Sequence, residues 1–262
     1  MYNLKSKVAS PLVLVCFITA CGTWFGNPPT TTDGSEDKNK QNQSSPQATL
    51  NLKGFTNSSF PLKSTTGDDL GKFLLELGLV SLSNIKFLAD GKEVGGIESN
   101  HVMNLLNNEF TPAITQMTVA ATTLDAVSFQ FRKLVTGDVS GFDASKLVGG
   151  SLFFRGNPVF KIGDKSYDLP GTELVDGTDE TLEIGTHCSA GKTLNLTKDS
   201  VNRILLDLNV EQWDGVDTTE ILLGNDTKAY LLKYMFGNVR KYFKVGVDLD
   251  GDGLLGTDEG CK

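Results

Sequence analysis

The sequence predicts a mainly β fold: an antiparallel β-sandwich with a few short helices and a C-terminal helix that leads into an acidic loop. Three observations support this prediction. Apolar and polar residues alternate along several segments, which is the signal of half-buried strands. Glycine-containing turns separate these segments. A long apolar pattern at helical spacing is clearest near the C-terminus.

The expected strands are short. Alternation is clearest in 127–132 (VSFQFR) and in 204–211 (ILLDLNVE). Residues 79–88 form another expected strand, which a turn at Asp90-Gly91 ends. Further candidate strands are 151–155, 159–162, 181–184 and 193–196. Hairpin turns are expected at Gly163-Asp164 and Gly191-Lys192. Residues 49–224 are therefore expected to form the β-sandwich body.

Helices are expected at three places. Two are short candidates, at 68–77 and 98–107. The strongest follows Asp226, which can cap it. Its apolar stripe is expected to pack in the core and not to bind a ligand, and it consists of Leu231, Leu232, Met235, Phe236, Val239 and Phe243. Residues 225–262 then form a C-terminal unit of helix and loop.

The N-terminus has the pattern of an export signal. Lys5 and Lys7 precede an almost uncharged apolar run at 8–20, which is shorter than the roughly 20 residues that span a bilayer. The run ends in Ile18-Thr19-Ala20-Cys21, which resembles the lipobox of bacterial lipoproteins. The resemblance implies that residues 1–20 are a signal peptide and that Cys21 carries a lipid. An ordinary secretory signal with an incidental cysteine is the alternative.

Residues 21–48 follow as a lipidated tether. The segment is rich in Pro, Gly, Ser, Thr, Asn and charged residues and has no apolar period, so we expect it to be disordered. A folded N-terminal arm is the alternative. By analogy with sorting rules in some Gram-negative bacteria, Gly22 in place of Asp after the lipidated cysteine favours the outer membrane, facing the periplasm or the cell surface.

Charge narrows the range of partners. The chain has 24 basic and 32 acidic side chains, a net charge of −8. Removal of Lys5 and Lys7 with the signal leaves 22 − 32 = −10 for the mature chain. This balance argues against nucleic acid and against anionic lipid surfaces, because both require basic patches. The expected membrane contact is therefore the N-terminal lipid.

Cysteine usage predicts one disulfide. Of the four cysteines, Cys16 leaves with the signal and Cys21 takes the lipid. Cys188 and Cys261 remain, and an exported compartment permits them to pair. Two free thiols are the alternative. A nucleophilic Cys188–His187 pair is disfavoured, because adjacent residues of a strand point to opposite faces.

The strongest chemical motif is DLDGDGLLGTDE at 248–259, which is similar to an EF-hand calcium loop. In that loop, carboxylates at the first, third and fifth positions and a bidentate twelfth residue surround the ion, the sixth position is a turning glycine, and the seventh supplies its carbonyl. Oxygen ligands of this kind suit Ca²⁺, whereas zinc prefers Cys and His. The resemblance assigns as metal ligands Asp248, Asp250, Asp252, Leu254 through its carbonyl, and Glu259.

The loop departs from the EF-hand pattern at its end. Only Gly260, Cys261 and Lys262 follow Glu259, so there is no exiting helix, and the chain has no second loop of this kind. A sensor that opens two helices would lack its moving parts. We therefore expect a structural calcium site, with the weak affinity of extracellular modules. An acidic turn that binds nothing is the alternative.

Three classes of function stay open. The favoured one is a non-enzymatic envelope or surface lipoprotein that binds an envelope or host protein, because the sequence has no GxSxG, P-loop or HExxH motif. The second is a structural component of envelope assembly. The third is a carboxylate-dependent, glycosidase-like hydrolase. Its candidate residues form two acidic groups, Asp176, Asp179, Glu180 and Glu183, and Asp214, Asp217 and Glu220.

Overall fold

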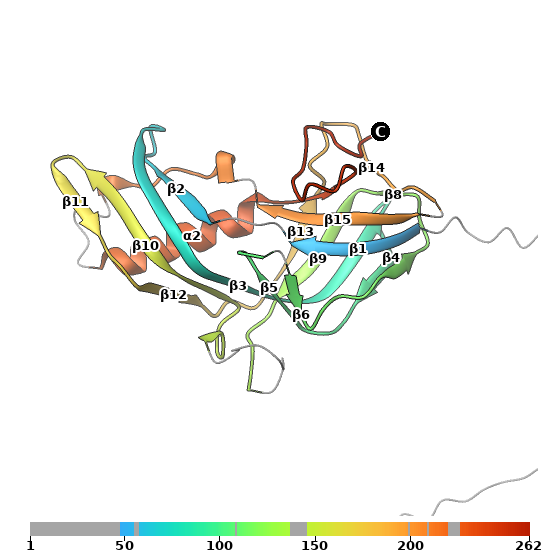
Figure 1. Ribbon diagram of the computed structural model, residues 1–262, viewed down its shortest axis with the longest axis horizontal. Coiled ribbons are helices and arrows are strands. Elements are labelled where there is room, and N and C mark those ends of the chain that lie inside the picture. The colour runs from blue at the N-terminus through green and yellow to red at the C-terminus, as the bar shows by residue number, and fades with distance from the viewer. Residues whose placement is uncertain are drawn as a thin grey trace, which may run out of the picture. The chain divides into compact units, whose positions relative to one another are not determined.

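The alternating segments form extended sheets in the computed structural model (Figure 1). The structure describes residues 48–54, 58–107, 109–136, 146–198, 200–208, 210–219 and 226–262, all of which belong to one compact unit, residues 43–262. Their elements are β1 (Ala48–Gly54), β2 (Ser59–Lys63), β3 (Asp69–Ala89), β4 (Lys92–Ile97), β5 (His101–Asn104), β6 (Glu109–Thr111), β7 (Met117–Val119), β8 (Thr123–Leu124), β9 (Ala126–Phe131), β10 (Leu152–Ile162), β11 (Lys165–Asp168), β12 (Thr172–Asp176), β13 (Glu180–Gly185), β14 (Leu194–Asn195), β15 (Val201–Leu208), η2 (Val210–Gln212), α2 (Thr227–Tyr242) and β16 (Phe243–Val247).

The large sheet is organised around β3, a strand of 21 residues. The main path of this sheet runs β11-β10-β3-β5-β6, and β2, β4, β9, β12 and β13 attach beside it. The first half of β3 pairs with β2 and β10, whereas the second half pairs with β4 and β9. Near Asn84, whose φ is +48°, the register with β9 shifts between Ser83 and Lys86. This irregularity lets one long strand serve two groups of partners.

A smaller sheet of order β16-β15-β1-β7 brings the C-terminus onto the body. In this sheet β1 and β15 are parallel, whereas β15 and β16 are antiparallel, with Ile204 opposite Val247. β16 follows α2 directly and ends immediately before the first residue of the acidic loop. The start of this loop is therefore fixed to the edge of a sheet.

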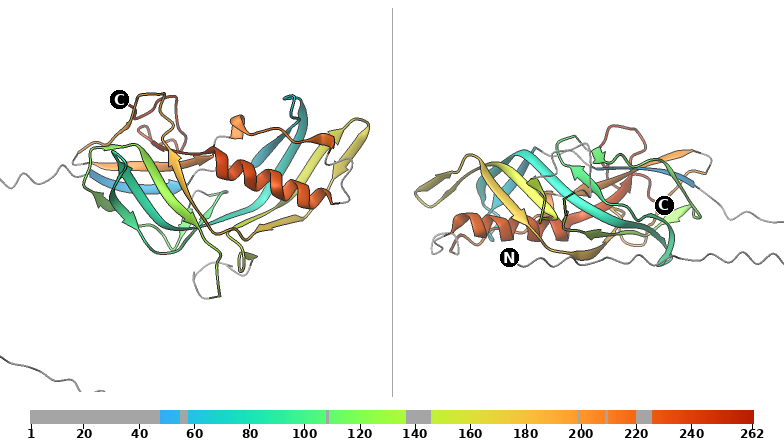
Figure 2. Two further views of the ribbon diagram at one scale, coloured as in Figure 1. Left: turned by 180° about the vertical axis from the view of Figure 1, so that it is seen from behind. Right: turned by 90° about the horizontal axis from the view of Figure 1, so that it is seen from below.

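Helix α2 lies over one face of the large sheet (Figure 2). Its first turn is capped by Asp226, whose side chain accepts a hydrogen bond from the Ala229 amide at 2.9 Å. The Phe236 ring packs on that of Phe154, with centroids 5.2 Å apart. The predicted stripe is largely buried, with Leu231, Met235, Phe236 and Val239 inside the core. Phe243 belongs to β16 instead of the helix.

The predicted fold class is confirmed, because the described chain is mainly β, with antiparallel sheets and a C-terminal helix. Four predicted strands also have their expected places, 79–88 in β3, 127–131 in β9, 181–184 in β13 and 204–208 in β15. The segments 151–155 and 159–162, expected as two strands, lie together in the single strand β10, which begins at Leu152. The Gly163-Asp164 turn joins β10 and β11 as a hairpin.

Two of the expected helices are wrong. Residues 69–77 belong to β3, and 101–104 form β5. Short apolar runs are compatible with both the helical and the strand periodicity. Here strand pairing determines the structure, because β2 and β10 flank the first segment, and β3 and β6 flank the second. The expected hairpin at Gly191-Lys192 is also wrong, because β13 pairs with β9 and β14 pairs with β8.

Candidate metal site at the C-terminal loop

The acidic loop begins at the sheet edge with Asp248. Its amide donates to the Arg203 carbonyl at 2.9 Å, which continues the β15–β16 ladder by one residue. The Asp248 side chain is fully buried, and its two oxygens accept hydrogen bonds from the amides of Gly251 (2.6 Å) and Gly253 (3.2 Å). The Arg203 guanidinium lies 3.1 Å from Oδ2 and compensates the buried charge.

The next two carboxylates are exposed and are ordered by their own loop. Asp250 accepts a hydrogen bond from the Asp252 amide at 3.1 Å, and Asp252 accepts one from the Leu254 amide at 2.8 Å. These local bonds curl the backbone, so one oxygen each of Asp248, Asp250 and Asp252 lies within 4.8 Å of the others. Three carboxylate oxygens at this spacing can coordinate a single hard cation.

Glu259 reaches back across the loop to its start. Its Oε1 accepts hydrogen bonds from the amides of Leu249 (2.5 Å) and Asp250 (3.3 Å), and its Oε2 accepts one from Gly256 (2.8 Å). These bonds place the carboxylate of Glu259, the twelfth residue of the motif, beside the backbone of Leu249 and Asp250 at its start. Oε1 already accepts two amides and Oε2 one, so a lone pair for a cation remains on Oε2, and Glu259 is not among the three carboxylates that lie within 4.8 Å of one another.

The sixth position requires glycine for its backbone. Gly253 has φ +83°, and a Cβ there would meet no other atom within 4 Å. The left-handed conformation, and not crowding, is therefore the constraint. Of the two loop leucines, Leu254 is 64% exposed, whereas Leu255 lies against Gly246 of β16.

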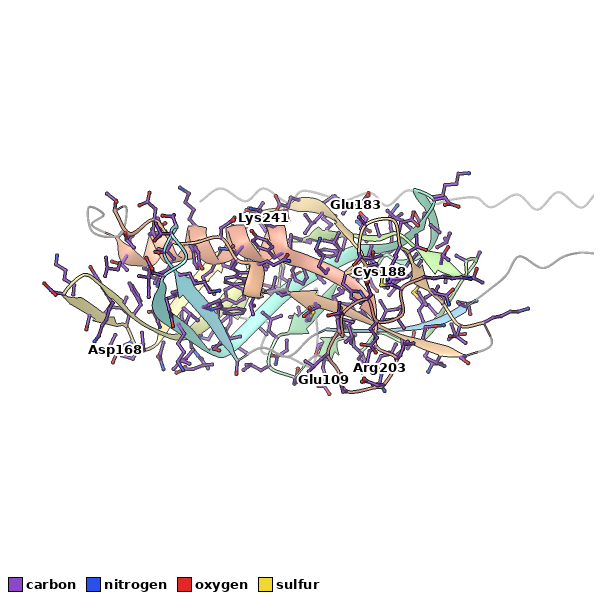
Figure 3. The ribbon with its side chains drawn as sticks, turned by 90° about the horizontal axis from the view of Figure 1, so that it is seen from above. Glu109, Asp168, Glu183, Cys188, Arg203 and Lys241 are labelled. Atoms are coloured by element: carbon purple, nitrogen blue, oxygen red, sulfur yellow. A yellow bond between two sulfur atoms is a disulfide. The ribbon has the colours of Figure 1, made fainter. Side chains whose placement is uncertain are left out.

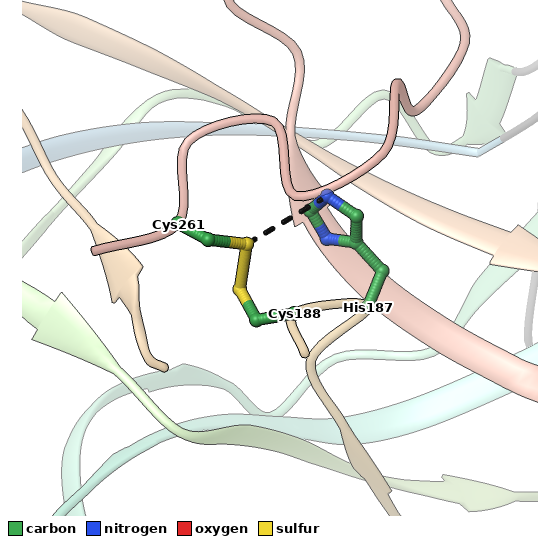
Figure 4. Close-up of side chains that lie close together, drawn as sticks. All are labelled: His187, Cys188 and Cys261. Atoms are coloured by element: carbon green, nitrogen blue, oxygen red, sulfur yellow. Dashed lines mark hydrogen bonds between the residues drawn. A yellow bond between two sulfur atoms is a disulfide. The ribbon is translucent and has the colours of Figure 1, made fainter. Parts of the chain in front are cut away.

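The far end of the loop is closed without a helix. Cys261 forms a disulfide with Cys188, with Cα atoms 5.7 Å apart (Figure 4). Residues 260–262 also pair with 193–195, including the hydrogen bond from the Asn195 amide to the Gly260 carbonyl at 2.8 Å. A covalent bond and a short ladder thus hold the C-terminal end of the loop.

A third connection holds the loop to residues 189–192. Asp258 accepts hydrogen bonds from the Ser189 amide (2.6 Å), the Ser189 hydroxyl (2.9 Å) and the Lys192 ammonium (2.8 Å). The Lys192 ammonium and then the Ser189 donors lower the pKa of Asp258 to about 2. This carboxylate therefore fixes the loop to its neighbour and is not a further ligand candidate.

His187 sits beside the disulfide. Its Nδ1 is 3.2 Å from the Val245 carbonyl, and its Nε2 is 3.9 Å from the Cys261 sulfur (Figure 4). Since both sulfurs are in a disulfide, neither is a thiol nucleophile. In Figure 3, Cys188 and Arg203 lie toward one end of the described unit and Asp168 toward the other.

The acidic groups considered for hydrolysis are engaged in structural contacts. Arg240 pairs with Asp176 and, at 2.6 Å, with Glu180. Asp179 accepts a hydrogen bond from the Lys133 amide at 2.6 Å. Asp214 binds Lys241 and the Tyr242 hydroxyl, and the Asp217 side chain accepts a bond from the Thr219 amide at 2.9 Å. Glu183 is exposed on β13, and Glu220 lies outside the described residues.

The sequence motif placed the five predicted ligands on one loop, but it did not predict the side chains from elsewhere in the chain that bind this loop. These are Arg203, Ser189 and Lys192, which are distant in sequence, so no spacing rule points to them. Cys21, the predicted signal peptide 1–20 and nearly all of the predicted tether 21–48 lie outside the described residues. Within the part of the chain that is described, no helix is long and apolar enough to cross a membrane.

Comparison with known proteins adds little. No protein-family model matches the chain, and no curated protein matches it. Among solved structures, MbnP from Methylosinus trichosporium is similar over 77% of this chain and 98% of that chain, at 10% identity and a TM-score of 0.32. At that TM-score the likeness supports no inference about function.

Proposed function

We propose that this chain is a non-enzymatic lipoprotein of the bacterial envelope, anchored by a lipid on Cys21 and facing the periplasm or the cell surface, whose C-terminal loop binds Ca²⁺. The carrying observation is the convergence of Asp248, Asp250 and Asp252 within 4.8 Å, with Glu259 held over the same loop. The bound ion stabilises the C-terminal end of the body. The body itself serves to bind an envelope or host protein.

The chemistry of the donors favours Ca²⁺. The predicted ligands are carboxylates and one carbonyl, which are hard oxygen donors, and a flexible loop suits the larger ion better than the octahedral shell of Mg²⁺. Without a cation, four carboxylates repel one another across a short loop, and Arg203 is paired with only one of them. A single unpaired loop is expected to bind in the range of roughly 10⁻⁴–10⁻³ M.

Calcium titration tests this site. The chain from residue 21 onward, stripped with EDTA, should give one binding event by calorimetry and a higher melting temperature in Ca²⁺. With free Ca²⁺ at about ten times Kd, mass action adds about 1.4 kcal/mol to the free energy of unfolding. Glu259→Ala should abolish both signals. Glu259→Gln should do the same while keeping an oxygen that accepts from the Leu249 amide.

Glu183→Gln is the matched control, because it removes an exposed carboxylate from β13, outside the loop. It should leave the calcium response unchanged. Absence of heat and of a thermal shift in the wild-type chain would remove the calcium proposal, as would an equal response to Mg²⁺ at the same concentration.

The lipid anchor is tested separately. Expressed in a bacterium with lipoprotein processing, the mature N-terminal peptide should begin at Cys21 and carry the mass of acyl chains in mass spectrometry. Cys21→Ser should move the protein from the membrane fraction to the soluble exported fraction. An unmodified mature N-terminus at another residue would exclude the anchor and leave the calcium result standing.

A further inference from the structure

A groove of about 980 Å³ opens where β2, the start of β3, the end of β10 and β11 meet. Figure 1 shows this part of the large sheet well apart from the C-terminal loop. The volume is at the upper end of the roughly 300–1,000 Å³ that small-molecule sites occupy. The apolar residues that line it are Pro61, Leu70, Val159, Phe160, Tyr167 and Val210.

The sheet register builds this lining. Pro61 on β2 pairs with Lys72 on β3, Lys72 pairs with Val159 on β10, and Val159 pairs with Asp168 on β11. In β2, the lining residues alternate with Phe60 and Leu62, whose side chains are buried in the core. The groove therefore uses the other face of the strands. Val159 is 41% exposed there, so the described residues leave an apolar side chain of this strand partly uncovered.

Near its start, β3 has a glycine, Gly71, where the backbone of β10 approaches closely. A Cβ on Gly71 would lie 2.2 Å from the Val159 carbonyl oxygen, so no other residue fits between these strands without moving them. The Phe160 and Tyr167 rings stack on the core-facing side of the same strands, with centroids 4.7 Å apart and planes 7° apart, and Phe160 is only 3% exposed. This pair therefore supports the strands from behind, and the apolar contact for an extended hydrocarbon chain comes from Pro61, Leu70 and Val159.

Three lysines line the same groove: Lys63, Lys72 and Lys161. Within the described chain, none of them forms an ion pair. Two carboxylates also line it, and that of Asp69 accepts a hydrogen bond from the Gly71 amide at 3.0 Å. Three ammonium groups against two carboxylates give this groove a net positive charge in a chain whose total is −8.

We propose that the groove binds a fatty acid, with its acyl chain along the apolar lining and its carboxylate among the three lysines. Lysine stems extend apolar contact while the ammonium group stays at the surface, so each can border the chain and reach the headgroup. Ammonium–carboxylate hydrogen bonds are charge-assisted and stronger than neutral ones. A neutral lipid would leave all three ammonium groups without a partner. This inference is independent of the calcium proposal.

Calorimetry with dodecanoate tests the proposal on the chain from residue 21 onward carrying Cys21→Ser, so that no attached lipid competes. One molecule should bind per chain. Dodecyl maltoside has the same tail without the charge, and butyrate has the charge without the tail. Both should bind at least about tenfold more weakly, because each loses one of the two kinds of contact.

Variants of the lining locate the site. Lys72→Glu and Lys161→Glu should each weaken dodecanoate binding about tenfold, and Asp168→Asn should strengthen it. Val159→Asn should weaken it through the tail. Lys92→Glu is the matched control, because Lys92 is an exposed lysine at the start of β4, outside the groove. Unchanged melting temperatures show that each variant is folded.

Several results would overturn the proposal. A folded wild-type chain that does not bind dodecanoate would do so, as would equal losses in Lys92→Glu and Lys72→Glu. Butyrate binding as tightly as dodecanoate would show a simple anion site. A dimer that Val159→Asn converts to a monomer in light scattering would show that a second copy of the chain covers the groove.

Discussion

At the scale of single residues, the acidic loop is built around one buried charge. Asp248 is buried, and two amides and one guanidinium surround its carboxylate. Removing one partner of such a group leaves an uncompensated charge, which is costly. Asp250 and Asp252 are exposed and have only local amide bonds. Asp248 is thus the fixed ligand candidate, and the exposed pair can adjust to an ion.

Another carboxylate, Asp214, gives the pH dependence that is easiest to measure. The Lys241 ammonium and then the Tyr242 hydroxyl lower its pKa. Because the folded state stabilises the ionised carboxylate, Asp214 contributes to the free energy of unfolding. This contribution is fully present above the unfolded pKa of about 3.9 and is lost as the pH falls through the lower pKa of the folded state. Asp214→Asn should therefore lower the melting temperature slightly at pH 7 and have no effect at the most acid pH.

Thermal melting of the wild-type chain and of the Asp214→Asn variant between neutral and acid pH measures this difference. Asp164→Asn is the control, since Asp164 lies in the turn between β10 and β11, and no ion pair involving it is found within the described chain. A difference in melting temperature between wild type and Asp214→Asn that grows as the pH falls would contradict the assignment.

The candidate ligands could be proposed from the sequence because the motif that they form is local. Its positions are read from consecutive residues, and the glycine at 253 has the left-handed φ that the motif requires. Arg203 could not be predicted in this way. Its contact with Asp248 spans 45 residues and depends on the register of β15 with β16, which only the folded sheet defines.

At the scale of elements, the long helix was predictable, whereas the two segments expected as short helices are strands. α2 has a cap, a stripe and 16 residues, and these features agree with one another. In residues 69–77, Phe73 and Leu75 alternate as in a strand, but the apolar Leu74 lies between them, so the periodicity fits both a strand and a helix. Pairing on both sides of this segment settles the matter: β2 directly precedes it in the sequence, but β10 follows about 80 residues later and only the folded sheet brings it alongside.

The cap of α2 makes a testable contribution. Asp226→Ala removes the acceptor of the Ala229 amide and should lower the free energy of unfolding by about 1 kcal/mol. Asp226→Ser keeps a capping oxygen and should retain most of the stability. Urea denaturation of the three proteins measures the difference. Equal losses in both variants would show that the Asp226 contribution is not capping.

At the scale of the whole molecule, several separate connections hold the C-terminal loop to the body. β16 pairs with β15 on one side, and the disulfide and the Asp258 contacts hold the other. All connect residues that lie far apart in the chain. The proposed ion would bind inside a loop whose two ends are already fixed, so less of its binding energy is spent on ordering.

The disulfide and calcium should therefore stabilise each other. Cys188 and Cys261 are 73 residues apart, and a bridge over such a loop contributes about 4 kcal/mol in the chain-entropy model. The double substitution Cys188→Ser and Cys261→Ser should remove about that amount in EDTA. It should also weaken calcium binding, because an unfixed loop must be ordered by the ion. By reciprocity, any loss of calcium affinity equals the gain in disulfide stabilisation that calcium provides.

Chemical denaturation and calorimetry of both forms, with and without Ca²⁺, measure the two sides of this cycle. Glu259→Gln in each background is the control, since calcium should then stabilise neither form. An unchanged calcium Kd in the double-serine variant would show that the loop is ordered without the disulfide. In that case the remaining contacts would preorganise the loop, those of Asp248 with Gly251, Gly253 and Arg203 and those of Asp258 with Ser189 and Lys192.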